Sequence, residues 1–457
     1  MNHFSATDAQ PFELAKELFG DEFIFGVSSS ALQTEGAWNE DGKGPSIWDE
    51  FSEKRKKILN GHHPKTATDF YHRFLEDISI AHSLNIRNFR FSISWSRIFP
   101  EGIGKVNQQG IDFYHRLIDS CLEKNIEPWI TLYHWDLPAS LEKKGGWVNR
   151  EIVHWFEEYV SLCVRTYKDK VKYWMVLNEP MVFTGAGYFL GIHAPGKKGM
   201  KNFLPAVHHT TLCQATGARI IQSESSTLQA GTTFSCSHVT PYSASPNDSA
   251  AAARVDALLN RLFIEPALGM GYPVNDLPFL KKISNYMKPG DESLVKADFD
   301  FIGIQNYTRE VVKHKFYIPH VQARLVPASE RKVYHTSMDW EVYPESVYEM
   351  IKRFSSYPGI KKIFVTENGA AFHDTVDRNA VQDDERIHFI SNYLQQVLQA
   401  KEEGHTIDGY FVWSLTDNFE WAEGYHPRFG LVYVDYEKQQ RIIKASGYWY
   451  KKFLEGS

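Results

Sequence analysis

Two glutamates stand at the ends of apolar runs and have the chemistry of a catalytic pair. Glu179 follows the run 173–178, and Glu367 closes the run 362–367. One carboxyl group of such a pair can protonate a departing oxygen while the other attacks or stabilises a cationic carbon, and cleavage of a glycosidic bond requires this division of work. The residue types alone leave open which glutamate has which role.

Five further apolar runs contain, or lead to, side chains that suit a polar pocket. The interiors of these runs are apolar, whereas amides, carboxylates, an imidazole and indoles gather at their ends. Burying so much polarity without a function would cost free energy, so we expect a polar pocket with aromatic walls. The residues concerned are Gln33, Glu35, Arg90, Trp95, His134, Trp135, Asp136, Gln305, Asn306, Tyr307, Trp413 and the segment 417–421.

Eight β-rich runs alternate with helical patterns along the chain. Several runs are nearly continuous in Phe, Ile, Val, Trp and Tyr, which is typical of parallel strands buried on both faces. With helical patterns such as 151–167 and 384–402 between them, they predict an α/β fold, a single-domain (β/α)8 TIM barrel over residues 1–457 with long insertions in its βα loops. The eight runs are 23–30, 88–95, 128–135, 173–178, 230–239, 299–307, 362–367 and 407–415.

A doubly wound parallel sheet is the alternative architecture. Such a sheet carries a glycine-rich phosphate-binding turn after an early strand, and the sequence contains neither of the two common forms of that motif. In a barrel the active site lies at the C-terminal ends of the strands, so we expect the polar strand-end residues to meet there.

The composition argues against several other classes of protein. The 457 residues carry a formal net charge of −6, and we interpret the basic segment 54–57 as a solvated turn, so no nucleic-acid partner is expected. The polar segment 1–10 has no secretory signal and no apolar run could span a bilayer, so we expect a cytoplasmic protein without a membrane partner. The four cysteines lack CxxC spacing, and His208 and His209 would point apart on a helix, so we expect no metal site.

Four segments resemble the signatures of glycoside hydrolase family 1, the β-glucosidase family. The resemblance runs from about residue 23 to residue 450, nearly the whole chain. One short motif would be moderate support, but four in the same order at the ends of predicted strands are specific. The segments are 23–36, similar to the N-terminal signature; 176–180, similar to the acid/base motif; 365–369, similar to the nucleophile motif; and 413–421, similar to the sugar-binding segment.

The resemblance implies a role for each matching residue. Glu367 would be the nucleophile and Glu179 the general acid/base. Arg90 and Tyr307 would hold and tune Glu367, because a nearby cation and a phenolic hydrogen bond both favour the carboxylate. The substrate-binding residues would be Gln33, His134, Trp135, Asn178, Gln305, Trp340, Trp413, Glu420, Trp421 and Phe429, with Trp413 beneath the terminal sugar, Asn178 at its 2-hydroxyl group and Trp340 toward the leaving group.

The sequence departs from the family pattern at three places. Leu32 stands where an aromatic or polar residue is usual before Gln33. Gln305 takes the position of the family's asparagine, which puts an amide contact on the leaving-group side in doubt. The segment 426–427 is His-Pro where small or basic residues are common, and we expect it to reshape the pocket entrance.

The resemblance predicts a retaining β-glucosidase that needs no cofactor. It would cleave short β-glucosides, aryl or cello-oligosaccharide, from the non-reducing end through a covalent glycosyl-enzyme, with galactosides and fucosides as further candidates. One alternative is a phospho-β-glycosidase, which Glu423 would disfavour if it faced the sugar. Another is a catalytically inactive sugar-binding relative, which the presence of both glutamates disfavours. The natural aglycone and the oligomeric state stay open.

Overall fold

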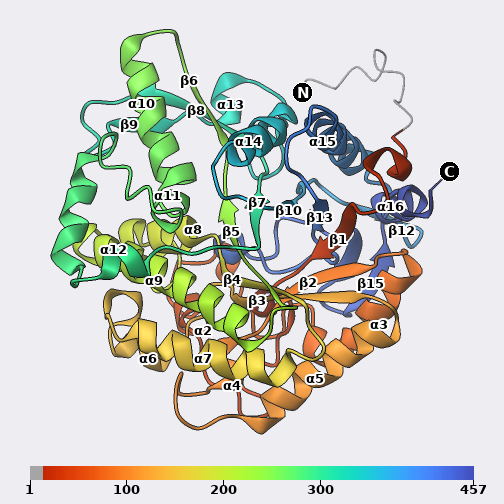
Figure 1. Ribbon diagram of the computed structural model, residues 1–457. Helices are drawn as coiled ribbons and strands as arrows, with labels where there is room; N and C mark the ends of the chain where they lie inside the picture. The colour runs from red at the N-terminus through yellow and green to blue at the C-terminus, as the bar shows by residue number, and fades with distance from the viewer. Residues whose placement is uncertain (1–13, 457) are drawn as a thin grey trace.

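The computed structural model describes residues 14–456, and a closed barrel of eight parallel strands forms its centre. The order around the barrel is β1-β13-β10-β7-β5-β4-β3-β2, and Figure 1 shows these strands inside a ring of helices. The predicted (β/α)8 fold is therefore confirmed. The barrel strands are β1 (Ile24–Ser28), β2 (Asn88–Ser92), β3 (Glu127–Tyr133), β4 (Tyr173–Asn178), β5 (Gln229–Ser235), β7 (Phe301–Gln305), β10 (Ile363–Asn368) and β13 (Gly409–Trp413).

One predicted strand, 230–239, is wrong in its extent. The barrel strand β5 ends at Ser235, and β6 (His238–Pro241) begins a separate three-stranded sheet with β8 (Arg309–His314) and β9 (Ala323–Leu325). The chain leaves the barrel here because β6 pairs with β8, with His238 opposite Arg309. This small sheet belongs to the long insertions that the sequence predicts between barrel strands.

Helices cover the outside of the barrel and bury one face against it (Figure 1). In α7 (Ile152–Tyr167) the buried side chains include Trp155, Tyr159 and Cys163, which recur every fourth residue and so share one face. This helix and α15 (Asp384–Glu402) agree with the two predicted helices. The other large helices around the barrel are α3 (Phe70–Ser83), α5 (Gln108–Glu123), α9 (Met200–Glu224), α14 (Glu345–Ser355) and α16 (Ala445–Glu455).

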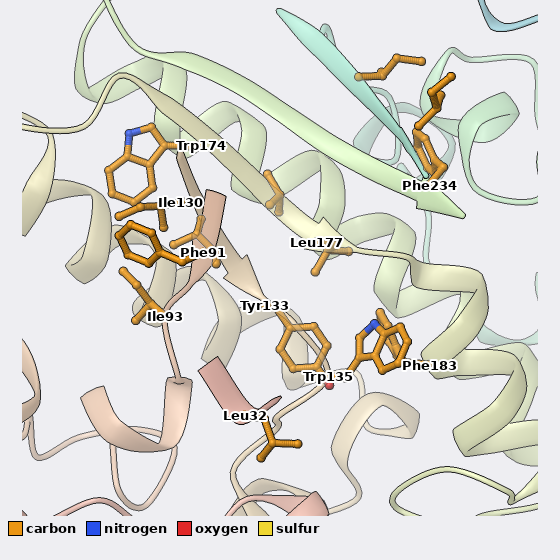
Figure 2. Close-up of a cluster of buried hydrophobic side chains, with 14 of the residues drawn as sticks. Leu32, Phe91, Ile93, Ile130, Tyr133, Trp135, Trp174, Leu177, Phe183 and Phe234 are labelled. Atoms are coloured by element: carbon orange, nitrogen blue, oxygen red, sulfur yellow. The ribbon is translucent and has the colours of Figure 1, made fainter. Parts of the chain in front are cut away.

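The main hydrophobic core fills the space between strands and helices. Figure 2 shows Phe91, Ile130 and Trp174, one from each of the adjacent strands β2, β3 and β4, gathered in this layer. All three side chains are buried. The opposite faces of these strands are covered as well. Because both faces are buried, the strands appear in the sequence as almost continuous apolar runs.

A second, aromatic cluster fills the inside of the barrel below its C-terminal end. The ring centroid of Trp129 on β3 lies 5.8 Å from that of Phe301, 5.1 Å from that of Phe364 and 5.0 Å from that of Phe411. These side chains come from strands that are not neighbours of β3, so they can meet only through the interior. The interior is therefore packed near the start of the strands, which leaves the other end for a cavity.

Within residues 14–456, no helix is long and apolar enough to cross a membrane. The four cysteines are buried free thiols. The segment 1–10, interpreted above as lacking a secretory signal, lies outside the described residues.

Candidate active site

A cavity of about 280 Å³ opens at the C-terminal ends of the barrel strands, where the sequence predicts the active site. All the residues to which the family resemblance assigns a role line it except Arg90 and Asn178, which are fully buried behind its wall. The lining residues that were predicted are Gln33, His134, Trp135, Glu179, Gln305, Tyr307, Trp340, Glu367, Trp413, Glu420, Trp421 and Phe429.

Three donors from different parts of the barrel hold the Glu367 carboxylate. Its Oε1 accepts hydrogen bonds from the guanidinium of Arg90 on β2 and from Gln305 Nε2 on β7, the latter at 2.8 Å. Its Oε2 accepts from the Tyr307 hydroxyl group at 2.7 Å. Hydrogen bonds to the charged form of a carboxyl group favour ionisation, so this arrangement stabilises Glu367 as a carboxylate.

Glu179 lies at a sharp turn between β4 and the short helix α8 (Pro180–Thr184). Its backbone is in the left-handed region with φ 44°, and Pro180 takes the first helical position, where its missing N–H is no loss. A non-glycine residue in this conformation costs about 1 kcal/mol or more. The turn leaves the Glu179 side chain lining the cavity, although only 7% of the residue is exposed.

The surroundings of the two glutamates differ in a way that separates their protonation. Burial, and next the negative charge of Glu367, raise the pKa of Glu179 well above its ordinary value, and a Ser235 hydrogen bond opposes this rise. Burial also raises the pKa of Glu367, but the charge of Arg90 and the hydrogen bond from Tyr307 oppose it. Since the cation and the phenol act on Glu367, the shared proton resides on Glu179.

Asn178 links these groups to His134. Its Oδ1 accepts hydrogen bonds from Arg90, from Gln305 Nε2 at 2.7 Å and from the Thr233 hydroxyl group at 3.1 Å. With the oxygen so occupied, its Nδ2 donates to His134 Nε2 at 3.0 Å. The imidazole is therefore a neutral acceptor at Nε2, in agreement with its pKa, which burial and then the charge of Arg90 hold well below the ordinary value.

Gln33 and Glu420 form another polar wall of the cavity. Gln33 Nε2 donates to the Phe419 carbonyl oxygen at 3.0 Å and lies 3.5 Å from Glu420 Oε2. Burial, and next the charges of Glu367 and Glu423, raise the pKa of Glu420 to about 8. Indole rings stand beside these groups, with the ring centroids of Trp135 and Trp421 4.3 Å apart. Such a combination of hydrogen-bonding groups and flat apolar faces can bind a sugar ring.

The three departures from the family pattern have different places. The amide of Gln305 lies between Glu367 and Asn178, at the centre of the site. Leu32 is buried but does not line the cavity, and neither does the exposed His426. The segment 426–427 is not among the residues that line the cavity, so the structure gives no support to the expectation that it reshapes the entrance.

Some strand-end residues that the sequence grouped with the site have structural partners instead. Glu35 is buried and pairs with Arg97 at 2.9 Å and with the Tyr114 hydroxyl group at 2.6 Å. His208, which the sequence placed on a helix and suggested only as a metal ligand, pairs with Asp291 at 2.7 Å. No cluster of three or more potential metal ligands occurs among the residues that the structure describes.

The sequence interpretation missed part of the cavity wall. The missed residues that follow β5 lay inside the predicted strand 230–239, so its excessive length hid a polar end of the kind found on the other strands. Others come from loops, from short helices and from β8, outside the barrel strands, and had no local signal. The missed residues are Val182, His193, Ser235, Cys236, Ser237, Thr308, Glu310, Met338 and Ala422.

Comparisons with known proteins agree with this geometry. The model of the family described as glycosyl hydrolase family 1 matches residues 15–457. Beta-glucosidase A of Acetivibrio thermocellus is 41% identical over 449 residues, which cover 97% of this chain and 100% of that protein. The 1,4-beta-D-glucan glucohydrolase of Thermotoga neapolitana is 42% identical over 441 residues, covering 96% and 98%.

Solved structures are similar over the same length. The beta-glucosidase from Thermotoga maritima in complex with glucoimidazole superposes with a TM-score of 0.91 at 40% identity, covering 96% of this chain and 98% of that one. The AHE enzyme from Alicyclobacillus herbarius gives a TM-score of 0.93 at 38% identity, covering 96% and 97%. With a family model matched from residue 15 to the last residue, a closed parallel barrel, and two buried glutamates facing one cavity, the chain belongs to glycosyl hydrolase family 1 and is a glycoside hydrolase.

Proposed function

We propose that this enzyme is a retaining β-glucosidase in which Glu367 is the nucleophile and Glu179 the general acid/base. One observation carries the assignment of roles. The two carboxyl groups face the same cavity, but a cation and a phenol hold only Glu367. Glu179 lies next to that charge in a buried position and retains its proton. A nucleophile must be ionised and an acid must be protonated, so the roles follow from the surroundings.

In the first step, Glu367 attacks the anomeric carbon while Glu179 donates its proton to the departing glycosidic oxygen. The bond between the anomeric carbon and that oxygen breaks, and an ester between the sugar and Glu367 forms. The charge of Glu367 disappears in the ester, so the chief electrostatic cause of the high pKa of Glu179 is removed. Glu179 is then left as a carboxylate that can act as a base.

In the second step, Glu179 takes a proton from a water molecule, which attacks the anomeric carbon from the face that the leaving group vacated. The ester breaks, Glu367 regains its charge, and the sugar leaves with its original anomeric configuration. Asn178 lies behind the cavity wall, and its Oδ1 accepts hydrogen bonds from Arg90 and Gln305, so it positions two of the donors that hold Glu367. Its contact with the 2-hydroxyl group of the sugar stays a prediction; hydrogen bonds to that group strengthen in the transition state.

The substrate class that this site fits best is an unphosphorylated β-glucoside, short-chain or aryl, cleaved from its non-reducing end. The relatives compared above include proteins named for beta-glucosidase and 1,4-beta-D-glucan glucohydrolase activity. Neither lysine nor arginine is among the described residues that line the cavity, whereas Glu420 and Glu423 are. A sugar phosphate would meet negative charge without a compensating cation, so the phospho-β-glycosidase alternative is disfavoured.

We also propose that residues 1–457 act as one catalytic domain in the cytoplasm. The buried free thiols are compatible with a reducing compartment.

Proton NMR of an early reaction mixture tests the proposed mechanism. With an aryl β-glucoside, the first free sugar to accumulate should be the β-anomer, before mutarotation mixes the anomers. The paired carboxyl groups of a retaining enzyme lie only ~5–5.5 Å apart, which leaves no space for a water molecule between nucleophile and sugar. An α-anomer formed first would rule out the double displacement.

A further inference from the structure

The two glutamates divide the rim of the barrel into two arcs. Glu179 follows β4 and Glu367 lies on β10, so one arc runs through β13, β1, β2 and β3, and the other through β7 and β5. In the proposed function, the anomeric carbon lies between the two carboxyl groups and the sugar ring lies over the first arc. The leaving group must then extend over the second arc. The residues that bind the sugar from the first arc are Gln33, His134, Trp413 and Glu420.

The second arc carries a cavity wall whose residues, apart from Gln305, Tyr307 and Trp340, have no role in the family resemblance or in the proposed mechanism. Ser237 follows β5, Thr308 follows β7, and Glu310 lies on β8 of the small outer sheet. The side chains of Met338 and Trp340 complete the wall with apolar surface. The wall therefore combines two hydroxyl groups, one carboxyl group and an aromatic face.

Glu310 is a carboxyl group of this wall without a partner. Within residues 14–456, its carboxyl group makes neither a hydrogen bond nor an ion pair, although the residue is half-buried. The nearby cations are already engaged by Glu341, which pairs with Arg309 at 2.8 and 3.0 Å and with Arg331 at 2.6 Å. Glu310 thus faces the cavity with its hydrogen-bonding capacity unused.

An unpartnered carboxylate next to apolar side chains is costly in the empty enzyme. Burial raises the pKa of Glu310 to about 7, and the distant charge of Arg331 lowers it only in part. A ligand group that donates hydrogen bonds or carries positive charge would recover the lost solvation, whereas an anionic group would add repulsion.

We propose that Glu310 is a specificity-determining residue of the leaving-group subsite, where it favours leaving groups with hydroxyl or ammonium donors and disfavours anionic ones. The inference rests on the proposed function, because the position of the leaving group follows from the roles of the two glutamates. Trp340 supplies a flat face for an aryl or sugar ring, and Glu310 then selects among rings by their substituents.

Three aryl β-glucosides test this proposal. Their phenyl rings carry an aminomethyl, a hydroxymethyl or a carboxyl group in the para position, and kcat/KM is measured at pH 8, where Glu310 is ionised. The ratio of kcat/KM for the cationic substrate to that for the anionic substrate should fall about tenfold in Glu310→Gln. Differences in intrinsic leaving ability cancel, because the same two substrates are compared in each enzyme.

Glu402→Gln is the matched control, because it removes the same charge from an exposed position of α15 outside the cavity. It should leave the ratio as it is in the wild type. Glu310→Asp keeps the charge and should keep most of the selectivity. Glu310→Ser is a second neutral variant, for use if Glu310→Gln folds poorly, and it should lose the selectivity in the same way.

An unchanged ratio in both neutral Glu310 variants, or an equal fall in the Glu402 control, would overturn the proposal. Either result could occur while the wild type still hydrolyses the hydroxymethyl substrate with retention, and the proposed function would then stand. Absence of turnover of that substrate by the wild type would instead contradict the proposed function.

Discussion

Tyr307→Phe removes a single hydrogen bond from the nucleophile and leaves the packing of the ring in place. The hydroxyl group donates to Glu367 Oε2 at 2.7 Å, a length typical of a bond to an ionised oxygen. The ring contacts Trp340 and Phe429, with centroids 5.2 and 6.1 Å away, and phenylalanine preserves both contacts. The substitution therefore tests the hydrogen bond rather than the shape of the cavity.

The expected fall in activity follows from the hydrogen-bond donors to Glu367 that remain in the variant. A hydrogen bond to a charged group contributes roughly 1.5–3 kcal/mol, which corresponds to about 10- to 150-fold in rate. Arg90 and Gln305 still donate to Glu367 Oε1 in the variant, so we expect the lower end, about a tenfold fall in kcat/KM for an aryl β-glucoside.

The pH profile should change in a defined direction. The hydroxyl group lowers the pKa of Glu367, so its removal raises that pKa. Glu367 must be ionised to attack, and activity is lost as the pH falls through its pKa. The acidic limb of kcat/KM, which reports the free enzyme, should thus move to higher pH.

Tyr167→Phe serves as the control. This hydroxyl group is also buried, but it donates to the Ile111 carbonyl oxygen at 3.1 Å, away from the cavity. An acidic limb that stays in place or moves to lower pH in Tyr307→Phe would refute the reasoning, as would an equal loss of activity in Tyr167→Phe.

Two further results should follow from the charges around the sugar. Glu420→Gln should raise the midpoint of thermal unfolding more at pH 9 than at pH 5. The pKa of Glu420 is raised from 4.5 to about 8, so the stability that its protonated form contributes is complete below 4.5 and is lost as the pH rises through about 8. A gain that does not grow with pH would contradict this origin. In addition, kcat/KM should be higher for an aryl β-glucoside than for its 6-phosphate, because Glu423 lines the cavity and no cation is among its described lining residues. A preference for the phosphate would reverse the choice of substrate class.

The barrel could be predicted from the sequence because its signal is local. Strands that are buried on both faces appear as uninterrupted apolar runs, and each change to polar residues marks a strand end at the active-site face. The boundary at Ser235 could not be predicted in this way. The residues that follow remain compatible with a strand, and the pairing of His238 with Arg309 in another sheet decides where the barrel strand ends.

Which residues form the site could be predicted only in part, because a polar residue at a strand end does not reveal which side chains it contacts. Glu35 follows the first run and resembles a site carboxylate in the sequence, but Arg97 and Tyr114 satisfy it away from the cavity. Glu310 gave no signal, since an outer sheet returns it to the cavity wall. The unequal surroundings of the two glutamates also depend on long-range contacts, above all on Arg90, which lies on another strand.

Two variants, one of each glutamate, leave opposite faces of the sugar open to an added nucleophile. Their products therefore distinguish the chemical roles of the two residues. Glu367→Gly removes the group that forms the ester, so turnover should collapse for every substrate. Azide can enter the vacated space and attack an activated glucoside from the nucleophile's side, which gives the α-glycosyl azide. Glu179→Ala should still form the ester with a nitrophenyl glucoside, because nitrophenolate leaves without a proton, and the ester should accumulate and produce a burst.

The most direct test of the proposed mechanism is therefore the anomeric configuration of the azide products of these two variants, determined by NMR. In Glu179→Ala, azide should replace water in the second step and give the β-glycosyl azide. We predict the α-azide from Glu367→Gly and the β-azide from Glu179→Ala. The opposite pairing would mean that Glu179 is the nucleophile and Glu367 the acid, and it would contradict the roles inferred from Arg90 and Tyr307.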